Sequence, residues 1–210
     1  MREGNYGSRQ RAATRGAQSR MLRIVGGSWR GRRFRFPALA EIRPTPDRVR
    51  ETLFNWLAAR VRESRCLDLF AGSGALGLEA LSRGASRAVF VEQAAEAVRE
   101  LDGRLSEWGA RNAQVIRSDA LQYLRGPRGD PESFDIVFLD PPFAGNLLTE
   151  AARLLEGEGW LAPQALIYIE SPAREALPPL PPTWRQRKTK QAGEVGYHLY
   201  VRGERGDAAT

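Results

Sequence analysis

The sequence has very few of the side chains that build disulfides and metal centres. Its 210 residues include a single cysteine, Cys66, and a single histidine, His198. One cysteine excludes a disulfide within the chain, so a reducing compartment is the default expectation. Zinc clusters of cysteine and histidine, and iron sites with two histidines, lack their ligands. We therefore expect no bound metal, and we expect His198, which lies in an alternating apolar run, to be structural.

Long apolar runs are also missing. No stretch reaches the roughly 20 apolar residues that a membrane-spanning helix needs, and the N-terminus has no apolar signal core. The sequence therefore predicts a soluble, cytoplasmic protein without membrane contact. A chain of 23.4 kDa suits one compact domain with a small appendage, and it can bury a core without cross-links. We expect it to act as a monomer.

Acidic side chains are scarce at one end of the chain. The formal net charge of the whole sequence is +7, whereas residues 1–35 hold ten arginines and one glutamate, a charge of +9. The remaining residues are close to neutral. A localised basic segment favours a polyanionic partner, and nucleic acid ranks ahead of a membrane because the segment lacks a strong apolar face. A merely solvated tail is the alternative.

The N-terminal part divides into a tail and a small folded extension. Residues 1–20 are polar and rich in arginine, which predicts a disordered basic tail. Residues 21–64 are expected to form an RNA-binding extension. Within it, Leu22–Val25 and Arg33–Phe36 predict a short β-hairpin with outward basic side chains. Trp29, near the tip of this hairpin, could grip RNA or cover the core.

A helix is expected to complete this extension. The prolines of Arg43-Pro44-Thr45-Pro46-Asp47 exclude helical geometry there, since each one biases its predecessor towards extended backbone. Asp47 is then a natural N-cap. Apolar residues at helical spacing follow it and predict an amphipathic helix over residues 48–63.

Residues 65–203 alternate short apolar runs with helical patterns. Strands are expected at 66–70, 88–91, 113–116, 136–139 and 165–169, and helices at 74–83, 94–108, 120–125 and 146–155. This alternation predicts an α/β domain with a doubly wound parallel sheet and helices on both faces. After a proline-rich loop at 177–183, runs at 185–188 and 195–201 predict an antiparallel C-terminal hairpin at the sheet edge. Residues 204–210 are expected to be a flexible tail.

A glycine-rich loop follows the first expected strand of this sheet. Gly72, Gly74 and Gly77 form a G-x-G-x-x-G pattern, and Glu92 ends the second strand 20 residues after Gly72. Glycines let the backbone approach a ligand, and a carboxylate at that strand end accepts hydrogen bonds from ribose hydroxyls. Asp68, just before the loop, would repel the pyrophosphate of a dinucleotide and attract an ammonium group. The pattern favours S-adenosylmethionine as cofactor, with a nicotinamide-dependent dehydrogenase as the alternative.

Further polar groups follow the third and fifth expected strands. Asp119, in Ser118-Asp119-Ala120, is placed to accept a hydrogen bond from an adenine amino group. The alternative is an N-cap for the helix at 120–125. Tyr168 and Glu170 end the fifth strand and face the same crevice, and a half-buried strand terminus is the simpler interpretation of both.

The fourth expected strand ends in the tetrapeptide Asp140-Pro141-Pro142-Phe143. Such strand ends face the ligand crevice, and two successive prolines make a rigid loop. The Asp140 carboxylate and the Pro141 carbonyl can accept the two N–H groups of an exocyclic amine, which directs its lone pair at an incoming methyl group. Phe143 can stack on the base. The pattern indicates methyl transfer to an amine, with a structural proline turn as the alternative.

Together these segments resemble one enzyme family. The glycine loop with Asp68 and Glu92, Ser118-Asp119-Ala120 and Asp140-Pro141-Pro142-Phe143 are similar to the S-adenosylmethionine-dependent amino-methyltransferases. Residues 43–57 and Arg23-Ile24-Val25-Gly26-Gly27 narrow the resemblance to the bacterial enzymes that methylate N2 of one guanine in small-subunit ribosomal RNA. The similarity covers about residues 21–202 and implies a Rossmann-like methyltransferase sheet.

The resemblance also implies a set of site residues. The cofactor would contact Asp68, Phe70, Ala71, Gly72, Ser73, Gly74, Glu92, Asp119 and Ala120. Asp140, Pro141, Pro142 and Phe143 would meet the guanine, and Arg23, Arg43, Thr45 and Arg48 would lie near the RNA or the cofactor's methionine end. The substrate would be 16S ribosomal RNA in an assembled or assembling 30S subunit. A DNA adenine or a protein amide as acceptor, and an RNA-binding protein without catalysis, stay open.

Overall fold

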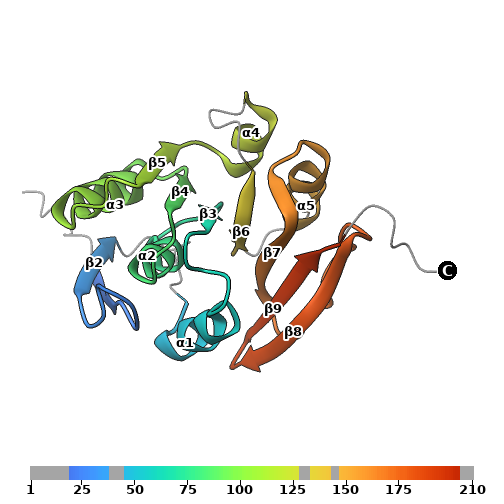
Figure 1. The fold of residues 1–210 in the computed structure, drawn as a ribbon, viewed down its shortest axis with the longest axis horizontal. Coiled ribbons are helices and arrows are strands. Elements are labelled where there is room, and N and C mark those ends of the chain that lie inside the picture. The colour runs from blue at the N-terminus through green and yellow to red at the C-terminus, as the bar shows by residue number, and fades with distance from the viewer. Residues whose placement is uncertain (1–18, 38–44, 128–132, 143–146, 204–210) are drawn as a thin grey trace, which may run out of the picture.

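The computed structural model describes residues 19–37, 45–127, 133–142 and 147–203 (Figure 1). Its strands are β1 (Ser19–Arg23), β2 (Arg33–Pro37), β3 (Arg65–Asp68), β4 (Arg87–Glu92), β5 (Ala113–Arg117), β6 (Phe134–Leu139), β7 (Leu161–Pro172), β8 (Trp184–Ala192) and β9 (Val195–Arg202). Its helices are α1 (Asp47–Trp56), α2 (Ala75–Ser82), α3 (Ala95–Glu107), α4 (Ala120–Arg125) and α5 (Leu147–Gly157). Among the described helices, none is long and apolar enough to cross a bilayer.

The main sheet has seven strands in the order β5-β4-β3-β6-β7-β9-β8. The strands from β5 to β7 are parallel, whereas β9 pairs antiparallel with both β7 and β8. The predicted parallel sheet and the C-terminal hairpin at its edge are therefore confirmed. The chain builds β3, β4 and β5 outwards in one direction and then returns to place β6 on the other side of β3. Ligands bind outside the carboxyl ends of the strands at such a switch point.

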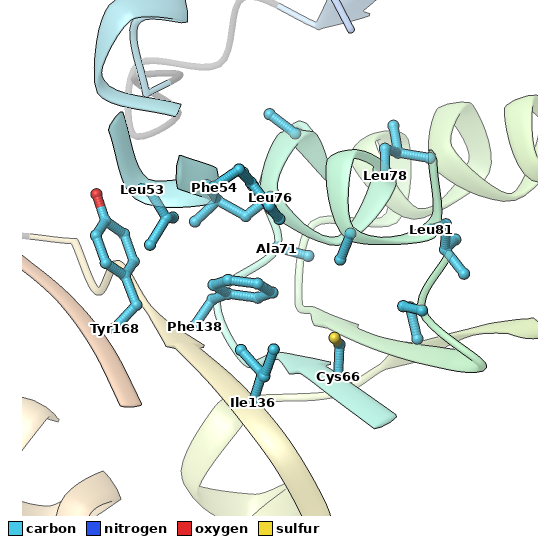
Figure 2. Packing of buried hydrophobic residues seen from close by; sticks show 14 of the residues in the cluster. Leu53, Phe54, Cys66, Ala71, Leu76, Leu78, Leu81, Ile136, Phe138 and Tyr168 are labelled. Carbon is cyan, nitrogen blue, oxygen red and sulfur yellow. The ribbon is translucent and has the colours of Figure 1, made fainter. Parts of the chain in front are cut away.

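Two apolar layers enclose the sheet, as strands with alternating side chains require. One layer packs α1, α2 and α3 on one face, and the other packs α4 and α5 on the opposite face. Figure 2 shows the first layer, where Leu53 and Phe54 of α1 and Leu76 of α2 lie over Phe138 of β6, with Ile136 beyond it. The ring centroids of Phe54 and Phe138 are 6.0 Å apart. This packing fixes α1 over the strand that carries the Asp-Pro-Pro motif.

The N-terminal hairpin is antiparallel, as predicted, and packs on α2 and α3. The backbone N–H of Ser28 donates to the Ser82 carbonyl at 2.7 Å, and Trp29 N–H donates to Ser82 Oγ at 2.9 Å. Gly27 has a φ of +77°, and a Cβ there would lie 1.9 Å from the Ser82 carbonyl oxygen. Trp29 is half-buried, with its ring centroid 5.1 Å from that of Trp108. It covers the core, which was one of its two predicted roles.

Three local predictions in this region are wrong. Ser19 and Arg20 belong to β1, although we expected the tail to run to residue 20. Pro46 holds the N-cap position, and Asp47 is the first helical residue, because its carboxylate pairs with Arg23 and Arg50 instead of capping the helix. The helix ends at Trp56 and not at residue 63, since the following turns bring the chain back towards β3. Apolar spacing continues through these turns because they pack on the same core.

Candidate active site

A cavity of about 850 Å³ lies at the carboxyl ends of the parallel strands. Most of the expected site residues line it, namely Thr45, Asp68, Phe70, Ala71, Gly72, Ser73, Glu92, Asp119, Ala120, Asp140, Pro141 and Pro142. Three expected residues, Arg23, Arg48 and Gly74, do not line it. Arg43 and Phe143 lie outside the described residues. The fold thus gathers residues from five strand ends and from the segment before α1 around one space.

The three glycines of the pattern set the conformation of the loop as well as leaving space beside it. Gly72 and Gly74 both have positive φ, at +52° and +73°. Gly74 is buried, and a Cβ on it would lie 2.5 Å from Leu101 Cδ1 of α3. A Cβ on Gly77 would lie 2.2 Å from Phe90 Cε1 of β4, so the third glycine lets α2 pack closely on the sheet. Gly72 therefore faces the cavity, whereas Gly74 and Gly77 position the loop.

Asp68 lies at the end of β3 and is 3% exposed. Its Oδ2 accepts a hydrogen bond from the Gly77 N–H at 2.9 Å. Burial raises the pKa of Asp68 to about 7, and the charges of Glu92 and Glu170 add to the shift. The neighbouring carboxylates disfavour ionisation of Asp68, so a cationic ligand beside Asp68 would favour its charged form.

Glu92 ends β4 and is fixed by the loops on either side of the cavity. Its Oε2 accepts from the Gly72 N–H at 2.8 Å, and its Oε1 accepts from the Ala94 N–H at 2.7 Å. A carboxylate oxygen has two lone pairs, so each oxygen can still accept a bond from a ribose hydroxyl. The backbone bonds hold the carboxylate in a fixed place for such a ligand.

Asp119 caps the helix that follows it, which was the alternative prediction for this residue, and it also lies on the cavity wall. It is the N-cap of α4, and its Oδ1 accepts from the Gln122 N–H at 2.9 Å. Its neighbour Ala120 lines the same wall. Capping therefore explains why this carboxylate stays in one orientation, and it leaves Oδ2 for a ligand.

Asp140 follows β6 and is half-buried on the cavity wall, with Pro141 and Pro142 next to it. Burial raises the pKa of Asp140 well above its usual range, and the nearby Glu170 and Asp68 carboxylates raise it further. A group that is costly to ionise in the apo site gains most from a partner that brings N–H donors or developing positive charge.

Glu170 is the site residue that the sequence-based interpretation undervalued. Glu170 is 5% exposed and Tyr168 fully buried, so the expected half-buried strand terminus is wrong. Glu170 Oε1 accepts from Thr45 Oγ1 and from the Tyr168 hydroxyl, each at 2.8 Å. The signal in the sequence is that Asp140 and Glu170 each follow an apolar run expected to be a parallel strand. In the structure, β6 and β7 are parallel with Leu139 opposite Ile169, so Asp140 and Glu170 come next on adjacent strands.

The lining of the cavity is strongly acidic. Seven carboxylates line it, from Asp68, Glu92, Asp119, Asp140, Glu170, Glu175 and Glu194, against one guanidinium, from Arg174. Such a field repels the pyrophosphate of a dinucleotide and attracts a cation. Among the described residues, no group of three or more potential ligands is arranged to hold a metal ion. The charge of the lining thus suits a positively charged ligand.

Of the predicted basic residues in the described part of the chain, Arg23 has a structural partner. Arg23 Nε lies 2.6 Å from Asp47 Oδ2. Arg48 is an exposed residue of α1. Sequence reasoning missed Arg50, which is fully buried and donates to the carbonyls of Arg23 and Thr45 at 2.8 and 3.2 Å. Its Nη1 lies 3.5 Å from Oε2 of the buried Glu79, so Arg50 ties the hairpin and the Thr45 segment to α2.

His198 has the structural surroundings that the sequence predicts. It lies on β9, with Nδ1 2.8 Å from Thr189 Oγ1 and Nε2 3.3 Å from Ser171 Oγ. It does not line the cavity.

The parallel sheet in this order, its antiparallel hairpin and the acidic cavity beside a glycine loop define the class of Rossmann-like methyltransferases. The same fold occurs in an RNA methyltransferase from Salinibacter ruber in complex with S-adenosyl-L-homocysteine, at a TM-score of 0.59 and 17% identity over 80% of this chain and 98% of that one. A protein-family model described as "Conserved hypothetical protein 95" matches residues 22–201. The chain belongs to this family, among the proteins called ribosomal RNA small subunit methyltransferase D.

Two matches from Escherichia coli illustrate the likeness. The curated "Ribosomal RNA small subunit methyltransferase D" of strain K12 is 48% identical over 190 residues, which are 90% of this chain and 94% of the relative. The solved structure of the protein yhhF is 48% identical, covers 87% of this chain and 98% of its own, and has a TM-score of 0.78. The family expected from the glycine loop and the two proline-containing motifs is thereby confirmed.

Proposed function

We propose that this protein transfers a methyl group from S-adenosylmethionine to the exocyclic N2 amine of a guanine in 16S ribosomal RNA. The observation that carries the proposal is the position of Asp140 and Pro141 on the wall of an acidic cavity beside the glycine loop. The name of the relatives supports methylation of small-subunit ribosomal RNA. The base and its N2 atom are inferred from the chemistry of the Asp-Pro-Pro motif and the family resemblance.

The cavity residues fit S-adenosylmethionine. Asp68 would receive the α-ammonium group, Glu92 the ribose hydroxyls, and Asp119 with the backbone at Ala120 the adenine. The preponderance of carboxylates in the lining favours a ligand that carries positive charge and no phosphate. When bound, this cofactor supplies a methyl group that its sulfonium already activates.

The protein's own residues would then prepare the amine. The lone pair of a guanine N2 is delocalised into the ring, so the nitrogen is a poor nucleophile. The Asp140 carboxylate and the Pro141 carbonyl would accept its two N–H groups and turn the lone pair out of the ring system. The same two acceptors would stabilise positive charge as it develops on nitrogen, and the Asp140 carboxylate would take up the proton that the methylated nitrogen releases. The rigid pair of prolines would hold both acceptors in place for in-line attack.

The N-terminal hairpin would contribute to RNA binding. Its register places Arg23 opposite Arg33 and Met21 opposite Arg35 on the exposed face, while Leu22 and Phe34 point into the core. Backbone phosphates are the natural partners of such a face. A 30S context, a monomeric state and a cytoplasmic location belong to the same proposal.

A methyl-transfer assay tests the proposal directly. The protein is incubated with labelled S-adenosylmethionine and small-subunit RNA, free or in subunits, from cells that lack the modification. We expect labelled N2-methylguanine, and an Asp140→Asn variant should lower turnover about 10²- to 10³-fold while its affinity for the cofactor stays within about threefold. Label on DNA adenine or on protein, with none in any RNA, would support the alternative acceptors. Calorimetry with a nicotinamide dinucleotide should detect no binding.

A further inference from the structure

The cavity has two sides that meet at Asp140. On one side, β3, β4 and β5 contribute the glycine loop, Glu92 and Asp119, which we assign to the cofactor. The other side, here called the β7–β9 side, is lined by Thr45, Pro46, Glu170, Pro172, Ala173, Arg174, Glu175, Glu194 and Val195. Because Asp140 is assigned to the amine that receives the methyl group and the first side to the cofactor, the target nucleotide would occupy the β7–β9 side.

Glu170 is the carboxylate of that side that stands next to Asp140. Leu139 of β6 pairs with Ile169 of β7 in parallel register, so the next residues along both strands are neighbours. Adjacent strands lie about 5 Å apart, which is also the scale of the hydrogen-bonding edge of a purine. The two carboxylates can therefore meet neighbouring atoms of one base.

The hydrogen bonds of Glu170 leave one of its oxygens for a ligand. Oε1 accepts from both Thr45 Oγ1 and the Tyr168 hydroxyl, each at 2.8 Å. Within the described part of the chain, Oε2 receives no hydrogen bond, although Glu170 is only 5% exposed and lines the cavity. Because Glu170 lines the cavity, this oxygen can accept a hydrogen bond from a donor that the ligand brings.

We propose that Glu170 Oε2 accepts the N1–H of the target guanine and so determines which base is methylated. This inference rests on the proposed function and deepens it. Guanine presents N1–H and the N2 amine side by side as donors, and Glu170 and Asp140 present acceptors side by side. Adenine carries a lone pair at N1, which would face the Glu170 carboxylate and be repelled. Discrimination by an unmatched buried polar group is strong, because neither partner can be satisfied.

Thr45 and Tyr168 are positioning residues in this arrangement. Both donate to Oε1, which fixes that oxygen and leaves Oε2 as the oxygen that can accept from a ligand. Thr45 reaches Glu170 from the segment before α1, and its own carbonyl is held by the buried Arg50 at 3.2 Å. The N-terminal extension thus helps to build the base pocket as well as the RNA-binding face.

The test uses a base that differs from guanine at N1. 2-Aminopurine keeps the amine at position 2 but has an acceptor at N1. The methylated position is first mapped with the wild-type protein, and RNA with either base at that position is then prepared. In Glu170→Gln, the amide oxygen can still accept from Thr45 and Tyr168, which turns the amide N–H groups towards the ligand. We expect kcat/KM for guanine to fall at least about 100-fold and the guanine-to-2-aminopurine ratio to fall by a similar factor.

Controls separate a reading role from a structural one. Glu158→Gln makes the same chemical change on an exposed residue after α5 and should behave as wild type. Cofactor affinity of Glu170→Gln should stay within about twofold of wild type. Should Glu170→Gln fail to fold, Thr45→Val removes one donor at similar volume and should lower the same ratio about tenfold.

The possible failures are distinguishable. An unchanged guanine-to-2-aminopurine ratio in both variants would overturn the role of Glu170 while leaving the proposed function intact. An equal loss of kcat/KM on both RNAs leaves this ratio unchanged and would also overturn the role of Glu170, since a structural defect affects methylation of both bases alike. If the wild-type protein methylates no guanine N2, the proposed function fails and this inference fails with it.

Discussion

The backbone N–H of Gly77 donates a hydrogen bond of 2.9 Å to Asp68 Oδ2. This bond joins the first turn of α2 to the carboxylate at the end of β3. The third glycine of the loop therefore holds Asp68, the residue proposed to bind the ammonium group of the cofactor. A side chain at Gly77 would collide with Phe90 of β4. Close packing of α2 on the sheet is therefore a condition for placing Asp68 in the cavity.

Cofactor affinity should depend on the ionisation of Asp68. Burial raises its pKa to about 7, so below that pH the apo protein holds a proton on this carboxyl group. A cationic ligand prefers the ionised form, so binding releases the proton and affinity increases as pH rises. Between about pH 6 and 7.5 we expect affinity to rise by about an order of magnitude at most. Calorimetry in buffers of different ionisation enthalpy measures both the affinity and the proton release.

An Asp68→Asn variant is the matched control for that measurement. The amide keeps the shape and can accept from Gly77 through its oxygen, but it does not titrate. Its affinity for the cofactor should be low and independent of pH in the same interval. A pH dependence as steep as that of the wild-type protein would assign the titration to another carboxylate of the cavity.

Gly77→Ala should damage both stability and cofactor binding. The added Cβ would lie 2.2 Å from Phe90 Cε1, which is buried and cannot move freely, so α2 has to shift away from β4. Overpacking of this kind costs about 1–3 kcal/mol in the free energy of unfolding. The shift also lengthens the Gly77–Asp68 hydrogen bond. Gly103→Ala, at a position of α3 where a Cβ meets no atom within 4 Å, should be harmless in the same denaturation and binding measurements.

Local sequence patterns predicted most of the fold, but they predicted only those parts of the site whose residues are close together in the sequence. The alternation of apolar runs and helical spacing located the seven strands of the main sheet, and the motifs after β3, β4, β5 and β6 line the cavity as expected. Thr45 and Glu170 are 125 residues apart, so no local pattern could pair them. The cap at Asp47 failed because a buried guanidinium, Arg50, takes its carboxylate as a partner. A contact between distant segments decided the first case, and the ion pairs of Asp47 with Arg23 of the hairpin and Arg50 of its own helix decided the second.

Removing the buried guanidinium of Arg50 should destabilise the protein strongly. Arg50 and Glu79 are both fully buried, and Glu79 Oε2 also accepts from the Val25 N–H at 2.9 Å. Arg50→Met removes one of the two guanidinium partners of Glu79, which keeps Arg83 at 2.9 Å. It also removes the hydrogen bonds of Arg50 to the Arg23 and Thr45 carbonyls. Together these losses should cost about 3–5 kcal/mol in the free energy of unfolding. Chemical denaturation measures the loss. Arg50→Met with Glu79→Gln should recover part of it, and strictly additive losses would show that the two side chains do not depend on one another.

Arginines on the exposed face of the β1–β2 hairpin should govern the salt dependence of RNA binding. Arg33 and Arg35 lie on that face beside Met21, which is 55% exposed, whereas Arg23 is already paired with Asp47. Replacing Arg33 and Arg35 with glutamine should weaken RNA binding uniformly and reduce the slope of log Kd against log salt by about 1.5.

The same double variant should bind the cofactor and melt as the wild-type protein does, because neither guanidinium reaches the cavity. Arg62→Gln is the matched control, since that side chain is 85% exposed and lies after α1, outside the hairpin. Arg62→Gln removes one charge and the hairpin variant two, so an equal change of slope per charge removed would show that the effect reflects net charge alone. If only the hairpin variant changes the slope, the RNA phosphates lie against the hairpin. The positively charged hairpin then binds RNA, while the acidic cavity binds the reactants.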